Sequence, residues 1–139
     1  MEVEFFTSSG VLRYGENRLV LDIDQGIVDY YRSMIPKYMD IRPQRYNAHI
    51  SVVRKEIKEP NRNFWFKHEN KEIDFVYSPK ICYDNRYYWL NVWSKGLETI
   101  RTELELSNIP HYIGDGYTPP PLNTDFIKTF HVTIGNRKK

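Results

Sequence analysis

Two short segments of this chain, AHISVV at 48–53 and FHVTIG at 130–135, each place a histidine two residues before a hydroxyl-bearing residue. In a β-strand, residues i and i+2 point to the same face of the sheet. His49 therefore shares a face with Ser51, and His131 shares a face with Thr133. The aliphatic residues between them face the other way. Two such strands set opposite each other bring two imidazoles and two hydroxyls into one cleft.

This set of groups suits the cleavage of a phosphodiester without a metal ion. The unperturbed pKa of histidine is about 6.5, so one neutral and one protonated imidazole can coexist near neutral pH. The neutral ring can remove a proton from the attacking oxygen, and the protonated ring can give one to the leaving oxygen. The two hydroxyls can donate hydrogen bonds to the non-bridging phosphoryl oxygens, where charge develops. No acidic cluster suited to Mg²⁺ is apparent in the sequence, so we expect neither a metal nor a cofactor.

The repetition of the motif matters more than the motif itself. A single H-x-[ST] occurs by chance in many proteins, and a histidine in a strand can serve the core alone. Here both copies are flanked by apolar residues at matching positions. Both are also followed by basic residues, Arg54 after the first and Arg137 after the second. His68 and His111 lack these apolar flanking residues, and we assign them no role.

The first half of the chain contains the elements that must position His49. Residues 18–23 alternate apolar and charged residues and predict a strand, and Asp24 is a candidate helix N-cap. The apolar residues of 25–38 recur at helical spacing, and Pro36 is expected to end or kink that helix. The strand that carries His49 follows.

The second half repeats this order. Residues 86–93 predict a strand, Ser94 a helix N-cap and residues 95–106 a helix, before the strand that carries His131. Residues 71–85, between the halves, predict one or two further strands. The 108–128 connection is long and rich in Gly, Pro and Tyr, and we interpret it as a lid or cleft wall. Strand–helix–strand units are common, so coincidence is an alternative explanation for the repeat.

Composition sets the class of protein. With 139 residues the chain is expected to form one domain, 1–139. Its single cysteine, Cys82, excludes an internal disulfide and fits a reducing cytosol. The N-terminal MEVEFF lacks the pattern of a signal peptide, and no apolar run reaches the roughly 20 residues of a membrane helix, so we expect no membrane contact. A net charge of +2 allows an anionic ligand but does not indicate a long nucleic-acid footprint.

The paired motifs on strands of a duplicated unit resemble the 2H phosphoesterase superfamily. The resemblance implies an α+β, bilobal fold, in which two pseudo-symmetric strand–helix–strand lobes with antiparallel sheets surround a central cleft. It also implies metal-independent action on 2′,3′-cyclic phosphates, 2′–5′ linkages and related RNA phosphodiesters. The residues that match the catalytic pattern of the superfamily are His49, Ser51, His131 and Thr133.

A closer resemblance covers most of the chain, from about Gly10 to Asn136. The segments GVLRYG, DQGIVDYYRSMIPK, YNAHISVVRKE, RYYWLN and FHVTIGN are similar to small T4-type bacteriophage proteins that counter CBASS immunity. Those proteins cleave cyclic di- and trinucleotide signals such as 3′,3′-cGAMP. The resemblance therefore implies a cyclic oligonucleotide substrate, no obligate protein partner, and action in the cytoplasm of the infected bacterial host. Attack by the ribose 2′-OH and attack by water both remain open, as does which histidine is the base.

Four further residues are candidates for substrate binding. Trp89 is our first choice for a platform on which a base stacks, although a core tryptophan is an equal alternative. Tyr14 can stack on the ligand or hydrogen-bond to it, Arg13 can contact phosphate, and Tyr117 in the long connection can close over the ligand.

The sequence is also compatible with three rival functions. The protein can act as an RNA 2′,3′-cyclic phosphodiesterase on RNA ends. It can bind a cyclic nucleotide or single-stranded RNA without turnover, as a sponge or adaptor. It can also have a purely structural role with the histidine strands as core, in which case replacing His49 or His131 damages folding rather than catalysis.

Overall fold

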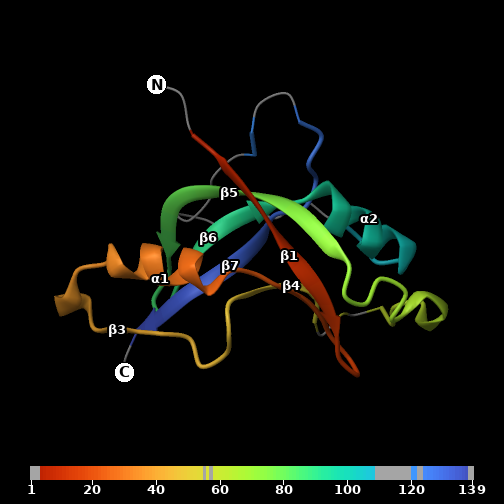
Figure 1. The fold of residues 1–139 in the computed structure, drawn as a ribbon, viewed down its shortest axis with the longest axis horizontal. Helices are drawn as coiled ribbons and strands as arrows, with labels where there is room; N and C mark the ends of the chain where they lie inside the picture. The colour runs from red at the N-terminus through yellow and green to blue at the C-terminus, as the bar shows by residue number, and fades with distance from the viewer. Residues whose placement is uncertain (1–3, 55, 57, 109–119, 122–123, 138–139) are drawn as a thin grey trace.

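The structure is a computed structural model that describes residues 4–54, 56, 58–108, 120–121 and 124–137 (Figure 1). Most of the 108–128 connection, including Tyr117, lies outside the described residues. The elements in chain order are β1 (Phe6–Tyr14), β2 (Leu19–Asp22), α1 (Gln25–Ser33), η1 (Lys37–Met39), β3 (Ile41–Arg42), β4 (His49–Val53), η2 (Arg62–Phe64), β5 (Glu72–Tyr83), β6 (Tyr87–Trp93), α2 (Lys95–Glu103) and β7 (Phe130–Arg137).

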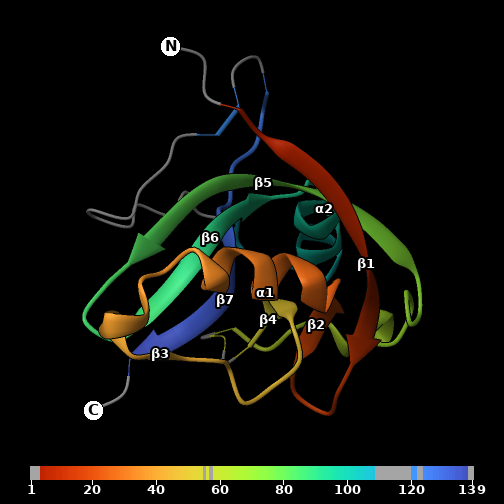
Figure 2. The same ribbon diagram turned by 60° about the vertical axis from the view of Figure 1, so that its left-hand side comes forward.

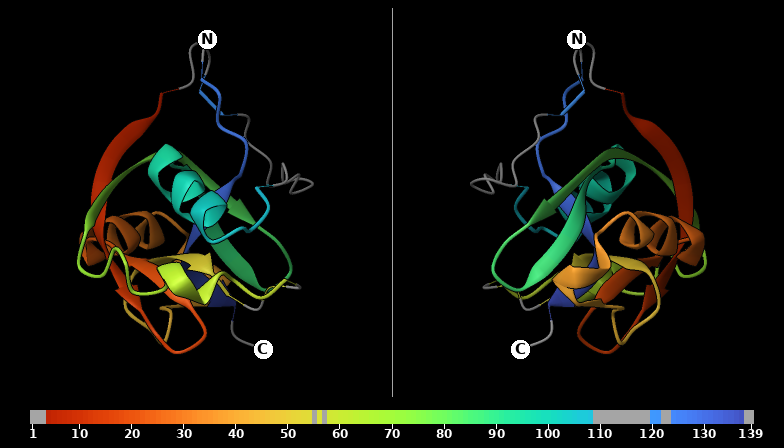
Figure 3. Two further views of the ribbon diagram at one scale, coloured as in Figure 1. Left: turned by 90° about the vertical axis from the view of Figure 1, so that its right-hand side faces the viewer. Right: turned by 90° about the vertical axis from the view of Figure 1, so that its left-hand side faces the viewer.

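The strands form a closed antiparallel barrel. Within the described residues, six strands pair in the order β7–β4–β2–β1–β5–β6, and β6 pairs back onto β7. The short β3 pairs with the C-terminal end of β7. Figure 3 shows β1 along one side of the molecule beside β5, with which it pairs over most of its length. Closure leaves few strand edges free to pair with other chains.

The expected bilobal α+β fold is wrong. Each half does contain the predicted order, as β2–α1–β4 and β6–α2–β7, but the halves do not form separate lobes. Their strands share one closed sheet, because β7 pairs with β4 on one side and with β6 on the other. Strand β1, which we did not predict, joins β2 to β5 at the other side of the ring. Which strand edges meet depends on pairing between distant residues, and alternation along a strand does not report it.

The two helices begin where the sequence predicts. The Asp24 side chain accepts a hydrogen bond from the Gly26 amide at 2.8 Å and caps α1, and Ser94 Oγ accepts one from the Leu97 amide at 3.2 Å and caps α2. Helix α1 ends at Ser33, before Pro36, and α2 ends at Glu103. In the view of Figure 2, α1 lies in front of the barrel and α2 behind it.

The hydrophobic core contains aliphatic or aromatic residues from every strand of the ring, together with buried residues of both helices. Helix α1 packs against β7, and α2 packs against β4 and β5. In β4 and β7 the aliphatic residues between the motif residues point into this core, as the alternation predicts. The core positions of the strands of the ring include Leu12, Leu21, Ile50, Phe75, Leu90, Val132 and Ile134.

Candidate functional site

The two H-x-[ST] strands are direct neighbours in the barrel. Ile50 of β4 is paired with Val132 of β7 in antiparallel orientation. Both are at most 1% exposed and belong to the core. The residues on either side of each therefore share the opposite face of the sheet. They are the four motif residues: His49, Ser51, His131 and Thr133.

The register determines how these four side chains are arranged. Since Ile50 pairs with Val132, the antiparallel order sets His49 opposite Thr133 and Ser51 opposite His131. The two imidazoles thus occupy one diagonal of a four-residue square, and the two hydroxyls occupy the other. Diagonal neighbours in an antiparallel pair lie about 7–8 Å apart. A phosphoryl group centred on the square is within reach of both rings.

The neutral ring of His49 has a defined tautomer. Its Nδ1 lies 2.8 Å from the backbone carbonyl oxygen of Asn47. A carbonyl can only accept a hydrogen bond, so Nδ1 carries a proton and donates it. Nε2 is then the basic nitrogen when the ring is neutral and a donor when it is protonated. The ring can therefore act as base or acid through the same atom, with its orientation held by the backbone.

The four motif residues line one cavity of about 710 Å³, a volume suited to a small ligand. The lining comes from strands β4, β6 and β7 and from the turn between β5 and β6. It also includes the segment before β4, the residue that follows β4 and the residue that precedes β2. At the rim, Asn136 Nδ2 donates to Gln44 Oε1 at 2.7 Å and joins the end of β7 to the segment before β4. The other lining residues are Arg18, Arg45, Tyr46, Arg54, Asp84, Arg86, Tyr87 and Trp89.

The cavity is lined mainly by positive charge. Its charged lining residues are four arginines and one aspartate, Asp84. Among the described residues, none of these four guanidinium groups forms an ion pair. Guanidinium groups bind phosphate through paired N–H donors. The lining therefore favours an anionic ligand, and the unpaired arginines are Arg18, Arg45, Arg54 and Arg86.

Sequence reasoning noticed only one of these arginines, Arg54, because it follows the first motif directly. Arg45 and its neighbour Tyr46 lie shortly before His49, and Arg86 lies at the start of a predicted strand. These positions beside chemistry-bearing strands are a signal that could have identified them. Arg18 precedes β2 and reaches the cavity only because β2 pairs with β4.

Aromatic side chains also contribute to the walls. Trp89 lines the cavity, but it is only 7% exposed and its indole Nε1 donates to Asn91 Oδ1 at 3.0 Å. Two tyrosines present more surface: Tyr46 is 60% exposed and Tyr87 is 38% exposed. The guanidinium carbon of Arg86 lies 5.4 Å from the centre of the Tyr87 ring. These tyrosines are better placed than Trp89 to contact a base.

Two predicted binding residues lie away from this cavity. Arg13 pairs with Asp22 at 2.7 Å on the β1–β2 ribbon. Tyr14 is buried, and its ring centre lies 5.2 Å from that of Trp65. Burial, as the largest effect, raises the pKa of Tyr14. Neither lines the cavity of the histidines: Tyr14 belongs to the hydrophobic core, and Arg13 lies two strands away from β4, where its guanidinium is held by Asp22. The third, Tyr117, is not among the described residues.

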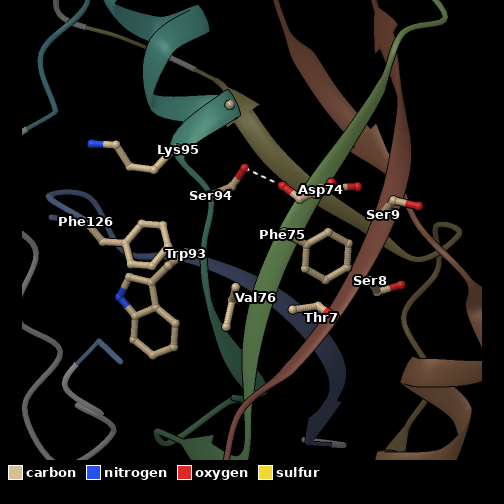
Figure 4. Close-up of a pocket in the computed structure, with 11 residues that line it drawn as sticks. Thr7, Ser8, Ser9, Asp74, Phe75, Val76, Trp93, Ser94, Lys95 and Phe126 are labelled. Carbon is tan, nitrogen blue, oxygen red and sulfur yellow. Dashed lines mark hydrogen bonds between the residues drawn. The ribbon is translucent and has the colours of Figure 1, made fainter. Parts of the chain in front are cut away.

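A second cavity, of about 580 Å³, lies between β1, β5 and the start of α2 (Figure 4). Its walls include Phe75, Trp93 and Phe126, and the Ser94 hydroxyl donates to the backbone carbonyl of Asp74 at 2.7 Å. No histidine is among its described lining residues. It therefore lacks the acid–base pair of the first cavity.

In the described part of the chain, no group of three or more histidine, cysteine, aspartate or glutamate side chains is placed to hold a metal ion. No helix among these residues is long and apolar enough to cross a membrane. Comparisons with protein-family models, with curated proteins and with solved structures find no match to this chain.

Proposed function

We propose that this protein is a metal-independent phosphodiesterase that opens cyclic di- or trinucleotides such as 3′,3′-cGAMP. The main support is the register of β4 and β7, which sets two imidazoles and two hydroxyls on crossed diagonals of one cavity. The cavity volume and its four arginines suit a small ligand with several phosphates. The sequence resemblance supports the cyclic substrate and a role in evading CBASS defence in the cytoplasm of an infected bacterium.

In the proposed reaction the ribose 2′-OH attacks the adjacent 3′–5′ phosphodiester. One imidazole takes the proton of the 2′-OH as a new bond forms between O2′ and phosphorus. The bond between phosphorus and O5′ breaks, and the other imidazole gives its proton to O5′. The ring opens to a linear product that ends in a 2′,3′-cyclic phosphate. Ser51 and Thr133 donate hydrogen bonds to the non-bridging oxygens as their charge increases.

The first test is turnover in the presence of EDTA. Wild-type protein is incubated with a panel of cyclic di- and trinucleotides, and products are read by mass spectrometry. We expect linear products, and a loss of about 10²- to 10⁴-fold in rate for His49→Ala and for His131→Ala. His68→Ala is the matched control, because His68 lies outside the cavity with its Nε2 2.8 Å from Glu103 Oε1. The rate should fall on both the acid and the alkaline side, since one imidazole works neutral and the other protonated.

Adding a 2′,3′-cyclic-ended RNA to this panel separates the rival functions. Turnover of a 2′,3′-cyclic-ended RNA, with none of the cyclic oligonucleotides, would keep the enzyme and change its substrate. Binding of a cyclic nucleotide without any product would indicate a sponge. Loss of folding in His49→Ala and His131→Ala, measured by circular dichroism, would indicate a structural role for the two strands.

A further inference from the structure

Helix α2 buries two opposite charges one turn apart. Glu98 is 3% exposed and Arg101 is 4% exposed. Buried charges are rare in proteins unless they are bound by partners, because they lose the solvation of water. Each of these two side chains holds the backbone of a different segment: one segment is the end of β4, and the other leads into β7.

Arg101 holds the end of β4. Its Nη1 donates to the carbonyl oxygen of Val52 at 2.8 Å, and Val52 directly follows Ser51. Its Nη2 donates to Glu56 Oε1 at 3.0 Å and to the carbonyl oxygen of Ser107 at 2.7 Å. Burial opposes ionisation of Glu56, but the hydrogen bond and the charge of Arg101 outweigh it and lower its pKa. The guanidinium therefore binds three acceptors on the chain around the end of β4 and after α2.

Glu98 holds the segment that leads into β7. Its Oε2 accepts hydrogen bonds from the backbone amides of Ile127, at 2.9 Å, and Lys128, at 3.1 Å. Its Oε1 accepts one from Lys95 Nζ at 3.1 Å. Strand β7 begins at Phe130, just before His131. The carboxylate thus fixes the chain shortly before it enters the strand that carries the second histidine.

The β-sheet alone gives these two strands little mutual support. The ladder between β4 and β7 consists of the single pair Ile50 and Val132, whereas β7 pairs with β6 over most of its length. If the register of Ile50 and Val132 continued along the strands, Val52 would lie opposite Phe130. Instead, the backbone carbonyl of Val52 accepts a hydrogen bond from Arg101. At this position a hydrogen bond from α2 takes the place of pairing with β7.

We propose that Glu98 and Arg101 form a clamp that holds β4 and β7 at the spacing the two histidines need. Both act through the strands, and neither lines the cavity, so they are positioning residues rather than catalytic ones. The part of this inference that concerns turnover rests on the proposed function. Misplacement of reacting groups by about 1 Å can cost about 10²-fold in rate.

The variants Glu98→Gln and Arg101→Lys test the clamp with little change in volume. Glutamine has one acceptor oxygen and no charge, so the hydrogen bonds from the loop amides lose their charge-assisted strength and the contact with Lys95 is lost. Lysine cannot reproduce the fork that spans three acceptors. Glu103→Gln is the matched control: Glu103 lies on the same helix, but it pairs with Lys67 and His68 and contacts neither strand.

We expect kcat on the cyclic dinucleotide to fall by about 10- to 100-fold in Glu98→Gln and in Arg101→Lys. KM should stay close to the wild-type value, because the arginines of the cavity are unchanged. Glu103→Gln should retain the wild-type kcat. Unchanged kcat in both clamp variants would overturn the inference, and so would an equal loss in Glu103→Gln, which would indicate a general effect of the helix.

Two measurements do not depend on activity and apply even if no cyclic nucleotide is turned over. In the wild type, hydrogen exchange should show protected amides at Ile127 and Lys128, although both precede β7. Exchange at the rate of an open chain would overturn the inference even if a variant fails to fold. The cross-strand nuclear Overhauser effect between Ile50 and Val132 should weaken in Arg101→Lys and persist in Glu103→Gln. Its persistence at full strength in Arg101→Lys would also overturn the inference.

Discussion

Replacement of Ile50 by alanine tests whether β4 and β7 pack as closely at the Ile50–Val132 pair as the structure shows. The Ile50 side chain is fully buried, between its strand partners Leu21 on β2 and Val132 on β7. Buried Ile→Ala substitutions cost about 2–5 kcal/mol, because they combine lost transfer energy with a residual cavity. For a chain of this size, that loss lowers the Tm by about 6–20 °C.

The assay is urea unfolding followed by tryptophan fluorescence, compared by midpoint at constant m-value. Ile127→Ala is the matched control, because the Ile127 side chain is 49% exposed and the change leaves its backbone amide in place. It should alter the free energy of unfolding by no more than about 0.5 kcal/mol. A double-mutant cycle of Ile50→Ala with Val132→Ala should give a coupling of about 0.5–3 kcal/mol, since the two residues are paired.

Two results would refute this reasoning. A loss below about 1 kcal/mol in Ile50→Ala would mean that the site is not closely packed or that its surroundings collapse freely. Additivity of Ile50→Ala and Val132→Ala would mean that the two residues are not in contact, and the diagonal arrangement of the histidines, which depends on their register, would fail with it.

Three further outcomes are expected. Asp84 accepts hydrogen bonds from the amides of Tyr87 and Arg86, which lower its pKa. That stabilisation is complete above the ordinary aspartate pKa and is lost as the pH falls through the lower folded value, so the excess stability of wild type over Asp84→Asn in urea should shrink below about pH 4. Ser94→Ala removes the α2 cap and should cost about 0.5–2 kcal/mol by thermal unfolding, and an unchanged Tm would refute the cap. Arg86→Met should raise KM for the cyclic dinucleotide by about tenfold through loss of a cavity cation, whereas Arg62→Met, outside the cavity, should leave it unchanged.

The local features of the site can be predicted from the amino-acid sequence. Side-chain alternation placed each histidine beside its hydroxyl and opposite the core residues, and the structure confirms this for β4 and β7. The sequence also predicts two N-caps and two strands that the structure confirms: Asp24, Ser94 and the strands at 18–23 and 86–93. Each of these features depends on residues a few positions apart in the sequence, because strand alternation and helix capping are local interactions.

Contacts between residues far apart in the sequence could be established only from the three-dimensional structure. The closed ring replaced the two expected lobes, because β1 joins β2 to β5 while β7 pairs with both β4 and β6. The same pairing brought Arg18 to the cavity, which Arg13 and Tyr14 do not line. Alternation tells which face a residue occupies, whereas strand register and barrel closure are set by contacts across the whole chain. The crossed diagonals of the two histidines and the two hydroxyls exist only because that register is fixed in three dimensions.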